Sequence, residues 1–380
     1  MSICSAEAAE AALIGRPWTQ ADTPVLLVDL DRMEANIALM AAEAREHGID
    51  LRPHFKTHKS VEIALRQMAA GAVGMTVAKL DEAAVLVDGG IRDVLVAYQI
   101  VAEPKLQRVM ELASRARLTV AVDSIAGAAA LSGVADAAGL RLRVSIEIDS
   151  GLHRCGVPVA DAAPLARAIA TLPGIEIDGV FTHAGHAYAA ANRDQVEHIA
   201  IHEAAAVRDA AEAIRAQGIP VRSVSAGSTP TAAVLAGQPG LTEIRPGNYV
   251  FYDAMQVALG TVPADRPALT IGATVISLSA PKWAVIDAGT KTLGLDKGPH
   301  GLAVVSNYGR LVDGDGVLDR LSEEHGTLHL EAGSQFAIGD RVRILPNHAC
   351  AVGNLGRFYA GVRDGIIREI ITVDAAGGVH

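Results

Sequence analysis

The hydrophobic and polar positions between Ile49 and about Asn248 repeat one alternation. A short β-branched run is followed by turn residues and then by a longer Ala-rich amphipathic stretch, which is the pattern of strand–helix units. About eight such units in succession predict an α/β protein built on a (β/α)8, or TIM, barrel. The predicted strands cover 51–55, 73–77, 93–97, 118–122, 142–148, 178–183, 222–226 and 243–246, and the main helices 60–70, 104–115, 160–171 and 192–217.

The pattern changes after about Met255. Short alternating runs, LTIGATVISL, WAVIDAG and RVRILPN, are separated by Gly, Pro and Asp turns, which predicts a smaller antiparallel β domain. The opening run PVLLVDL is one strand more than the barrel needs, so we assign it to the β domain. The expected domains are a barrel at 31–255 and a β domain formed by 1–30 and 256–380.

Composition and charge narrow the function classes. The net charge of −10, without a cluster of Lys and Arg, argues against a nucleic-acid partner. No run reaches the ~20 apolar residues of a membrane helix, and the N-terminal segment lacks the basic start and apolar run of a secretory signal. Three widely spaced cysteines fit a reducing cytoplasm better than a disulfide framework. We expect a cytoplasmic protein that acts on a small molecule.

The residues that follow the predicted strands are the first candidates for chemistry, because the carboxyl ends of barrel strands gather at one mouth. They are unusually polar. The set comprises His54, Lys56, Asp123, Asp149, His153, Arg154, His183, Tyr188 and the run 227–229.

Lys56, in the segment RPHFKTHKS, ends the first predicted strand between His54 and His58. A partly desolvated lysine near cationic groups has a lowered pKa, which makes its amine a nucleophile for carbonyl compounds. The alternative is a surface lysine beside a helix start. Lys59 is the local competitor, and we expect it to be solvated.

The segment SAGSTPT follows the seventh predicted strand and precedes a helix. Outward-pointing backbone N–H groups of residues 227–229 at a helix start would bind a phosphate, and barrels often bind phosphate here. The alternative is an ordinary helix N-cap at Ser228 or Thr229, with Pro230 in the first turn.

The segment PNHAC sets His348 and Cys350 two residues apart in a strand-like or loop stretch, so we expect both side chains to point the same way. Imidazole and thiolate together favour zinc over magnesium or calcium, and two ligands leave positions open for water and substrate. A buried free thiol near an unrelated histidine is the alternative.

A second pair of histidines, His198 and His202, has the i, i+4 spacing of a metal site on one helix face. The neighbours Glu197 and Glu203 and the lack of a third ligand indicate a solvated surface instead. We therefore expect no metal at this helix.

Arg154, in DSGLHRCGV, is expected over the barrel mouth. An arginine that faced the pyridine nitrogen of a pyridoxal cofactor would keep that nitrogen unprotonated. An ion pair with Asp149 or Asp123 fits the pattern equally well.

Taken together, these segments resemble the fold-type III pyridoxal-phosphate enzymes, in particular the group of D-serine dehydratase, D-threo-3-hydroxyaspartate dehydratase and D-threonine aldolase. The resemblance implies an alanine-racemase-like barrel in which Lys56 carries pyridoxal 5′-phosphate and Arg154 faces the pyridine nitrogen. It also implies a homodimer. The segments that carry it are TPVLLVDLDRMEANI, RPHFKTHK, SGLHRCGV, FTHAGHAY, SAGSTPT, RPGNYVFYD, VIDAG, SEEHG and PNHAC.

The same resemblance implies further site residues. His348 and Cys350 would bind a divalent metal, which could be zinc, manganese or cobalt. The remaining cofactor-pocket candidates are His183, Tyr188, Gly227, Ser228, Thr229, Tyr252 and Asp253.

The resemblance favours a dehydratase over an aldolase. The aldolases are similar to one another in an HxD metal motif, a second histidine five positions after the one matching His183, and a glycine-richer phosphate loop. Here the motif ends in Cys350, the fifth position is Tyr188 and the loop reads GSTPT. Lys56 would then remove the α-proton, and Tyr188 and His186 are the other catalytic candidates.

The expected reaction converts a D-β-hydroxy amino acid, D-threo-3-hydroxyaspartate or D-serine, to a 2-oxo acid and ammonia, with the metal polarising the departing hydroxyl. The alternative is a D-threonine aldolase that yields glycine and an aldehyde. A non-catalytic pyridoxal-phosphate-binding protein and an amino acid racemase are less favoured, because neither needs a metal pair.

Overall fold

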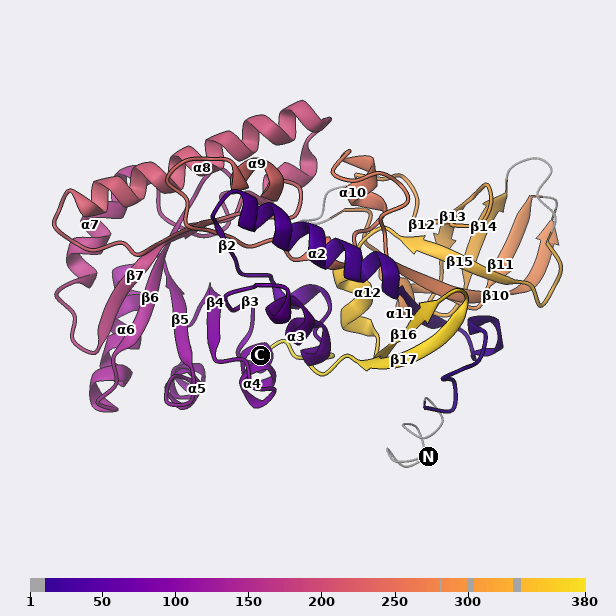
Figure 1. The fold of residues 1–380 in the computed structure, drawn as a ribbon, viewed down its shortest axis with the longest axis horizontal. Coiled ribbons are helices and arrows are strands. Elements are labelled where there is room, and N and C mark those ends of the chain that lie inside the picture. Colours follow the sequence, from indigo (N-terminus) through magenta and orange to yellow (C-terminus); the bar gives the residue numbers. More distant parts are fainter. Residues whose placement is uncertain (1–10, 281, 299–303, 331–335) are drawn as a thin grey trace. The chain divides into compact units, whose positions relative to one another are not determined.

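The structure is a computed structural model, which describes residues 11–280, 282–298, 304–330 and 336–380. The chain forms two compact units (Figure 1). The barrel unit consists of Leu39–Lys56, Ala64–Gly247 and Gly378–His380. The β unit consists of the described part of Met1–Ala38, Thr57–Ile63 and the described part of Asn248–Gly377.

The barrel unit contains one eight-stranded sheet in the order β2-β9-β8-β7-β6-β5-β4-β3, and all neighbouring strands are parallel. The first and last strands close on each other, since Val73 N–H donates to Leu51 O at 2.9 Å and Thr76 N–H donates to Pro53 O at 2.8 Å. The predicted (β/α)8 barrel is confirmed. Its strands are β2 (Asp50–Leu51), β3 (Met75–Val77), β4 (Asp93–Gln99), β5 (Arg117–Val122), β6 (Leu142–Ile148), β7 (Ile175–Thr182), β8 (Ser223–Ala226) and β9 (Glu243–Ile244).

The barrel strands carry almost unbroken runs of buried side chains, because helices cover one face and the other face lines the barrel interior. In β6 only Arg143 is partly exposed. Figure 1 shows α4 to α7 on the outer side of the strands. The helices from the start of the chain to the end of the barrel are α2 (Leu30–Glu46), α3 (Val61–Ala69), α4 (Leu80–Asp88), α5 (Glu103–Ala113), α6 (Ile125–Ala137), α7 (Val159–Ile169), α8 (Arg193–Arg215) and α9 (Ala232–Ala236).

The predicted strand bounds agree with the structure within a few residues except at the first strand. β2 ends at Leu51, and Phe55–Thr57 form a 3-10 turn, η2. Backbone pairing nevertheless continues beyond β2, since His54 N–H donates to Pro246 O at 3.0 Å and His54 forms a parallel bridge with Thr76. The prediction of a strand over 51–55 is therefore wrong at Phe55, which belongs to the turn that carries Lys56.

The β unit contains a nine-stranded sheet in the order β11-β14-β13-β12-β15-β10-β1-β16-β17. Neighbouring strands are antiparallel except β1 and β16, and β10 also pairs with β11, which closes a small barrel. The strands are β1 (Val25–Asp29), β10 (Leu269–Ala280), β11 (Trp283–Ile286), β12 (Gly309–Leu311), β13 (Gly316–Leu321), β14 (Gly326–Leu330), β15 (Arg341–Pro346), β16 (Phe358–Arg363) and β17 (Ile366–Thr372).

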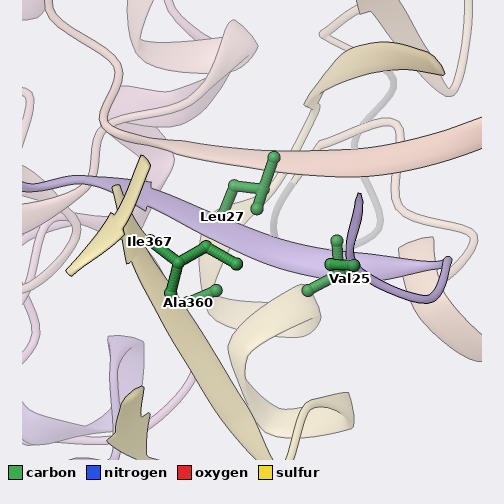
Figure 2. Packing of buried hydrophobic residues seen from close by; sticks show 5 residues of the cluster. Val25, Leu27, Ala360 and Ile367 are labelled. Atoms are coloured by element: carbon green, nitrogen blue, oxygen red, sulfur yellow. The ribbon is translucent and has the colours of Figure 1, made fainter. Parts of the chain in front are cut away.

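The opening strand β1 belongs to the β unit, as predicted, and its side chains explain why. Figure 2 shows Val25 and Leu27 of β1 packed with Ala360 of β16 and Ile367 of β17. Burial of these apolar side chains stabilises the pairing of strands that lie far apart in the sequence. Three short helices, α10 (Ala254–Ala258), α11 (Thr290–Leu293) and α12 (Ala349–Leu355), join elements of this unit. None of the helices described is long and apolar enough to span a membrane.

Candidate active site

His54 lies at the centre of a cationic cluster in the barrel unit. Its pKa is well below the ordinary value because of burial and then of the charges of four neighbours, which are Lys56, Arg245, His183 and Arg154. His54 is therefore neutral near pH 7, and its Nδ1 accepts the backbone N–H of Lys56 at 3.3 Å. This concentration of positive charge suits an anionic ligand.

Asp149 organises the loop that follows β6. Its Oδ1 accepts the backbone N–H groups of Gly151 and His153 at 2.9 and 3.0 Å, and its Oδ2 lies 2.6 Å from His153 Nδ1. Burial would raise the pKa of Asp149, but these hydrogen bonds lower it overall. The Asp149 carboxylate is thus hydrogen-bonded within its own loop. These contacts give no support to the alternative of an ion pair between Asp149 and Arg154.

Arg154 is exposed at the end of this loop and lies near the buried carboxyl of Glu147. Burial raises the pKa of Glu147, although the Gln99 amide and the charge of Arg154 lower it. Ligand atoms of Asp123, Glu147 and Cys155 all lie within 4.8 Å of one another. Asp123 already accepts Gly156 N–H at 3.2 Å and Glu147 accepts the Gln99 amide, so this set holds the loop that presents Arg154.

In the loop after β8, the predicted phosphate site, two of the backbone N–H groups already bind other protein groups. Gly227 has a φ of +120°, and its N–H donates to Glu203 Oε1 at 3.0 Å, while Ser228 N–H donates to Thr231 Oγ1 at 3.1 Å. Helix α9 begins only after its N-cap Thr231. The expectation that the N–H groups of Gly227 and Ser228 point outward is wrong, and so is the alternative of a cap at Ser228 or Thr229.

The segment after β7 carries three of the predicted side chains. His183 Nδ1 lies 3.4 Å from Gly227 O, and the half-buried Tyr188 lies on the 3-10 helix η3 (Gly185–Ala189). The His186 ring is next to Gly151, where a Cβ would lie 3.3 Å from His186 Cε1. Burial and then His202 lower the pKa of His186, so His186 is neutral near pH 7 and can accept a proton.

A cavity of about 300 Å³ lies at the opposite end of the barrel. Paired charges line it, with Arg52 Nε 2.6 Å from Glu243 Oε2 and Arg52 Nη1 2.7 Å from Asp93 Oδ1. Residues at the amino ends of barrel strands usually serve the stability of the barrel. We therefore assign the chemistry to the mouth that holds Lys56 rather than to this cavity.

His348 and Cys350 lie at the start of α12 in the β unit. His348 is the N-cap, with extended backbone as predicted, but Cys350 is the second helical residue. The predicted strand-like or loop stretch is therefore wrong at Cys350, although the two side chains do come together. His348 Nδ1 lies 2.7 Å from Asp296 Oδ2. Burial lowers the pKa of His348, but Cys350 and Asp296 raise it overall to about 10.

The second neighbour of the thiol is Thr57, whose Oγ1 lies 3.2 Å from Cys350 Sγ. A histidine whose far ring nitrogen is held by a carboxylate is the usual arrangement at protein metal sites. A thiol at a helix N-terminus is also readily ionised. Imidazole and thiolate donors, supported in this way, fit a zinc-like divalent cation.

Asp253 hydrogen-bonds the peptide between the two candidate metal ligands. It is fully buried, and its Oδ2 accepts the Asn248 amide at 2.6 Å and the backbone N–H of Ala349, between the two candidate ligands, at 2.9 Å. Tyr252, the neighbouring candidate, has a φ of +48°, and burial raises its pKa to about 12. Its hydroxyl is therefore protonated at neutral pH.

Two sequence expectations about charged side chains were wrong. Lys59 is not solvated, since it is 5% exposed and its Nζ donates to Asn354 Oδ1 at 2.6 Å. Glu203 is completely buried, although His198 and His202 on the same helix are exposed as predicted.

Four residues near the candidate site were missed by sequence reasoning: Thr57, Glu203, Arg245 and Asp296. Arg245 is buried and donates to Thr182 O at 2.6 Å. For Glu203 a signal existed, because it falls in the buried stripe of α8 that includes Val196, Ala200 and Val207. The others depend on contacts between distant segments and leave no local pattern.

A parallel barrel with a lysine turn at its mouth, together with an antiparallel β unit, is the architecture of alanine-racemase-like proteins. Residues 28–254 match the family described as alanine racemase, N-terminal domain, and residues 268–362 match the putative serine dehydratase domain. The chain belongs to the family that joins these two domains.

Known proteins of this family are similar over nearly the whole chain. D-threo-3-hydroxyaspartate dehydratase of Delftia sp. (strain HT23) is 41% identical over 350 residues, which cover 87% of this chain and 92% of the relative. The crystal structure of D-threonine aldolase from Filomicrobium marinum superposes with a TM-score of 0.89 at 34% identity and covers 97% of this chain and 99% of that one.

Two solved variants of a D-threo-3-hydroxyaspartate dehydratase are also similar, with TM-scores of 0.87 and 0.86 at 36% identity. They cover 97% and 94% of this chain and 98% of each variant chain. One replaces a histidine by alanine, and the other replaces a cysteine two residues further along and is described as metal-free.

Proposed function

We propose that this protein is a pyridoxal-phosphate- and metal-dependent lyase that dehydrates a D-β-hydroxy amino acid. D-threo-3-hydroxyaspartate and D-serine are the proposed substrates, and a 2-oxo acid and ammonia the products. The observation that carries the proposal is the pair His348 and Cys350 at the start of α12. The same two residue types, two positions apart, were changed in the dehydratase variants, and the cysteine variant is the metal-free one.

The barrel mouth fits a phosphorylated cofactor. The charges gathered around His54 would balance the phosphate, and Lys56 would hold the cofactor through its amine. When bound, pyridoxal phosphate withdraws electrons from the substrate α-carbon and makes its proton removable. Ser228 and Thr229, 4% exposed each, offer hydroxyl groups to the phosphate.

Lys56 is also the proposed base for the α-proton. Its neighbour His54 is neutral, because burial and surrounding charges keep its pKa low, and His54 Nδ1 accepts the Lys56 backbone N–H in the turn that carries the lysine. Arg154 would donate a hydrogen bond to a facing pyridine nitrogen and keep that nitrogen free of a proton. Thr57, which contacts the Cys350 thiol, directly follows Lys56 in the sequence.

The metal site fits an elimination reaction because only two protein ligands, His348 and Cys350, are proposed for the metal. A divalent ion held by His348 and Cys350 would retain open positions, and its chemistry there is Lewis-acid activation of a hydroxyl leaving group. Asp296 would fix the His348 ring, and Asp253 would fix the Ala349 peptide between the two ligands.

A retro-aldol reaction is the second candidate function. The similarity to the Filomicrobium marinum aldolase favours it, and the neutral imidazole of His186 could take the proton of a β-hydroxyl. The residue types Tyr188 and Cys350 in this chain favour the dehydratase.

Product analysis tests the proposal. The purified protein, supplied with pyridoxal phosphate and zinc or manganese, is incubated separately with D-threo-3-hydroxyaspartate, D-serine and D-threonine, and 2-oxo acid, ammonia and glycine are measured. We expect 2-oxo acid and ammonia in equal amounts, with the L-enantiomers as inactive controls. Glycine as the main product would establish the aldolase instead.

Oligomeric state and location belong to the same proposal. We expect a homodimer on the family resemblance. We expect a location in the cytoplasm because the cysteines in the described part of the chain, Cys155 and Cys350, form no disulfide. Light scattering of the purified protein gives the molar mass, and a monomeric mass would contradict the dimer.

A further inference from the structure

Glu203 is a buried carboxyl group whose contacts lie outside the proposed chemistry. It is 0% exposed in the middle of α8, while Glu197 on the same helix is exposed. A carboxylate taken out of water is costly unless hydrogen bonds replace the water. Hydrogen bonds are therefore expected to stabilise Glu203 among the apolar side chains on the buried face of α8.

One oxygen of Glu203 joins the two loops that follow β7 and β8. Oε1 accepts Ala184 N–H at 2.9 Å and Gly227 N–H at 3.0 Å. Ala184 directly follows His183, and Gly227 directly precedes Ser228. The Glu203 side chain of α8 thus holds two backbone positions. One lies beside His183, a predicted pocket residue, and the other is Gly227 in the predicted phosphate loop.

Both backbone polar groups of Gly227 have a partner. Its N–H is bonded to Glu203, and its carbonyl oxygen faces His183 Nδ1 at 3.4 Å. A carbonyl only accepts hydrogen bonds, so this contact needs a proton on His183 Nδ1. The φ of +120° at Gly227 is open to glycine but strained for other residues.

The loop continues with a second, internal network. Ser228 N–H donates to Thr231 Oγ1 at 3.1 Å, and Thr231 Oγ1 lies 3.1 Å from Ser228 Oγ. Both hydroxyl residues are buried. Ser228 is thus bonded to Thr231, and it directly follows the Gly227 residue whose N–H Glu203 binds.

We propose that Glu203 is a positioning residue, which fixes the Gly227 peptide and thereby sets the tautomer of His183 and the placement of Ser228 for the cofactor phosphate. This inference rests on the proposed function, because it takes the phosphate of pyridoxal phosphate as the ligand of that loop. The proposed role requires only that one oxygen of Glu203 accepts two N–H groups. The amide oxygen of a glutamine at this position can accept the same two hydrogen bonds.

Three variants test the role of Glu203. Glu203→Gln keeps an acceptor oxygen, Glu203→Leu removes it and leaves two buried N–H groups unsatisfied, and Glu197→Gln is the exposed control on the same helix. Cofactor affinity is measured by titrating each apoprotein with pyridoxal phosphate and following visible absorbance. We expect the leucine variant to bind the cofactor at least about tenfold more weakly, and both glutamine variants to stay within about threefold of the unsubstituted protein.

The His183 tautomer provides a second measurement, which is made first on the unsubstituted protein. In protein labelled with ¹⁵N-histidine, the His183 signal, assigned with His183→Gln, should report a proton on Nδ1, and it should lose that form in the leucine variant. A proton on Nε2 in the unsubstituted protein, or unchanged cofactor affinity in a folded leucine variant, would overturn the inference. If the unsubstituted protein binds no pyridoxal phosphate, the proposed function fails, whereas the tautomer still decides the role of Glu203.

Discussion

At Gly227 the backbone takes a conformation that the candidate phosphate loop depends on. A Cβ at this position would be strained by the φ of +120° and would lie 3.3 Å from Leu235 Cδ1 and 3.4 Å from Arg245 N. Gly133 is different, since it lies exposed inside α6, where a Cβ would meet no atom of the described residues within 4 Å. The two glycines therefore have opposite tolerance for a methyl group.

Gly227→Ala should destabilise the protein by about 1–3 kcal/mol and weaken cofactor binding, because the alanine forces the loop out of its positive-φ conformation. Gly133→Ala should stabilise it by about 0.5–1 kcal/mol, because alanine is the better helix former. Urea unfolding and cofactor titration of both variants check this pair. Equal cofactor affinity in the two variants would contradict the role assigned to Gly227.

Burial raises the pKa of Glu203 above its ordinary 4.5, although hydrogen bonds from Ala184 and Gly227 act in the opposite direction. The folded state then binds this proton more tightly than the unfolded state. The contribution of Glu203 to stability is full below the unfolded pKa and is lost as the pH rises through the folded pKa.

Glu203→Gln should consequently gain stability relative to the unsubstituted protein as the pH rises from about 4.5 towards 8, because the amide has no proton to lose. Thermal unfolding midpoints of both proteins across this range measure the difference. Glu197→Gln, at an exposed position, should show no such trend. A difference that stays constant with pH would show that Glu203 does not titrate there.

At the scale of elements, the hydrophobic pattern predicted the barrel well because each strand is buried on both faces. For β6 the predicted and observed bounds coincide at Leu142–Ile148. The pattern failed at Phe55, which lies in the turn that carries Lys56 and not in the predicted strand. It also failed after β15, where a strand ends and α12 begins, so the spacing of His348 and Cys350 was informative but its geometry was not.

The candidate site was less predictable than the fold, for a physical reason. Loop residues such as Lys56 and Arg154 were found because they follow strands. A residue such as Asp296, 2.7 Å from His348 Nδ1, was not found, because its role comes from a contact between distant segments. Glu203 was misplaced because its charge was given more weight than the helical spacing that puts it among buried residues.

Asp253 joins two elements of the β unit. It is the N-cap of α10, where it accepts Gln256 N–H at 3.1 Å, and it also accepts Ala349 N–H at the start of α12. Asp253→Asn should lower stability by about 1–3 kcal/mol and metal affinity by about tenfold, because an amide nitrogen replaces one of the two carboxylate oxygens and cannot accept the hydrogen bonds made there.

Competition with a chromogenic chelator measures that metal affinity. Ser124→Ala is the control, since Ser124 is the N-cap of α6 and accepts Gly127 N–H at 3.2 Å. It should cost about 1 kcal/mol of stability without a change in metal affinity. If Asp253→Asn bound metal as tightly as Ser124→Ala, Asp253 would be only a helix cap.

At the scale of the whole molecule, the two candidate binding groups belong to different compact units. Lys56, Arg154 and His183 belong to the barrel unit, whereas His348 and Cys350 belong to the β unit. A ligand stabilises the part of a protein that it binds. The proposed lyase needs both ligands for turnover, but each unit carries the protein groups that hold its own ligand.

Removal of either group should therefore abolish turnover while leaving the other ligand bound. Lys56→Ala should lose the visible absorbance of the bound cofactor and keep a stoichiometric metal ion. His348→Ala or Cys350→Ala should lose the metal and keep the absorbance, because the proposed cofactor-binding residues lie outside α12. Absorbance spectra and metal analysis of the same preparations provide the comparison. Should the metal variants also release the cofactor, the two ligands would depend on each other, and the division of binding between the units would have to be abandoned.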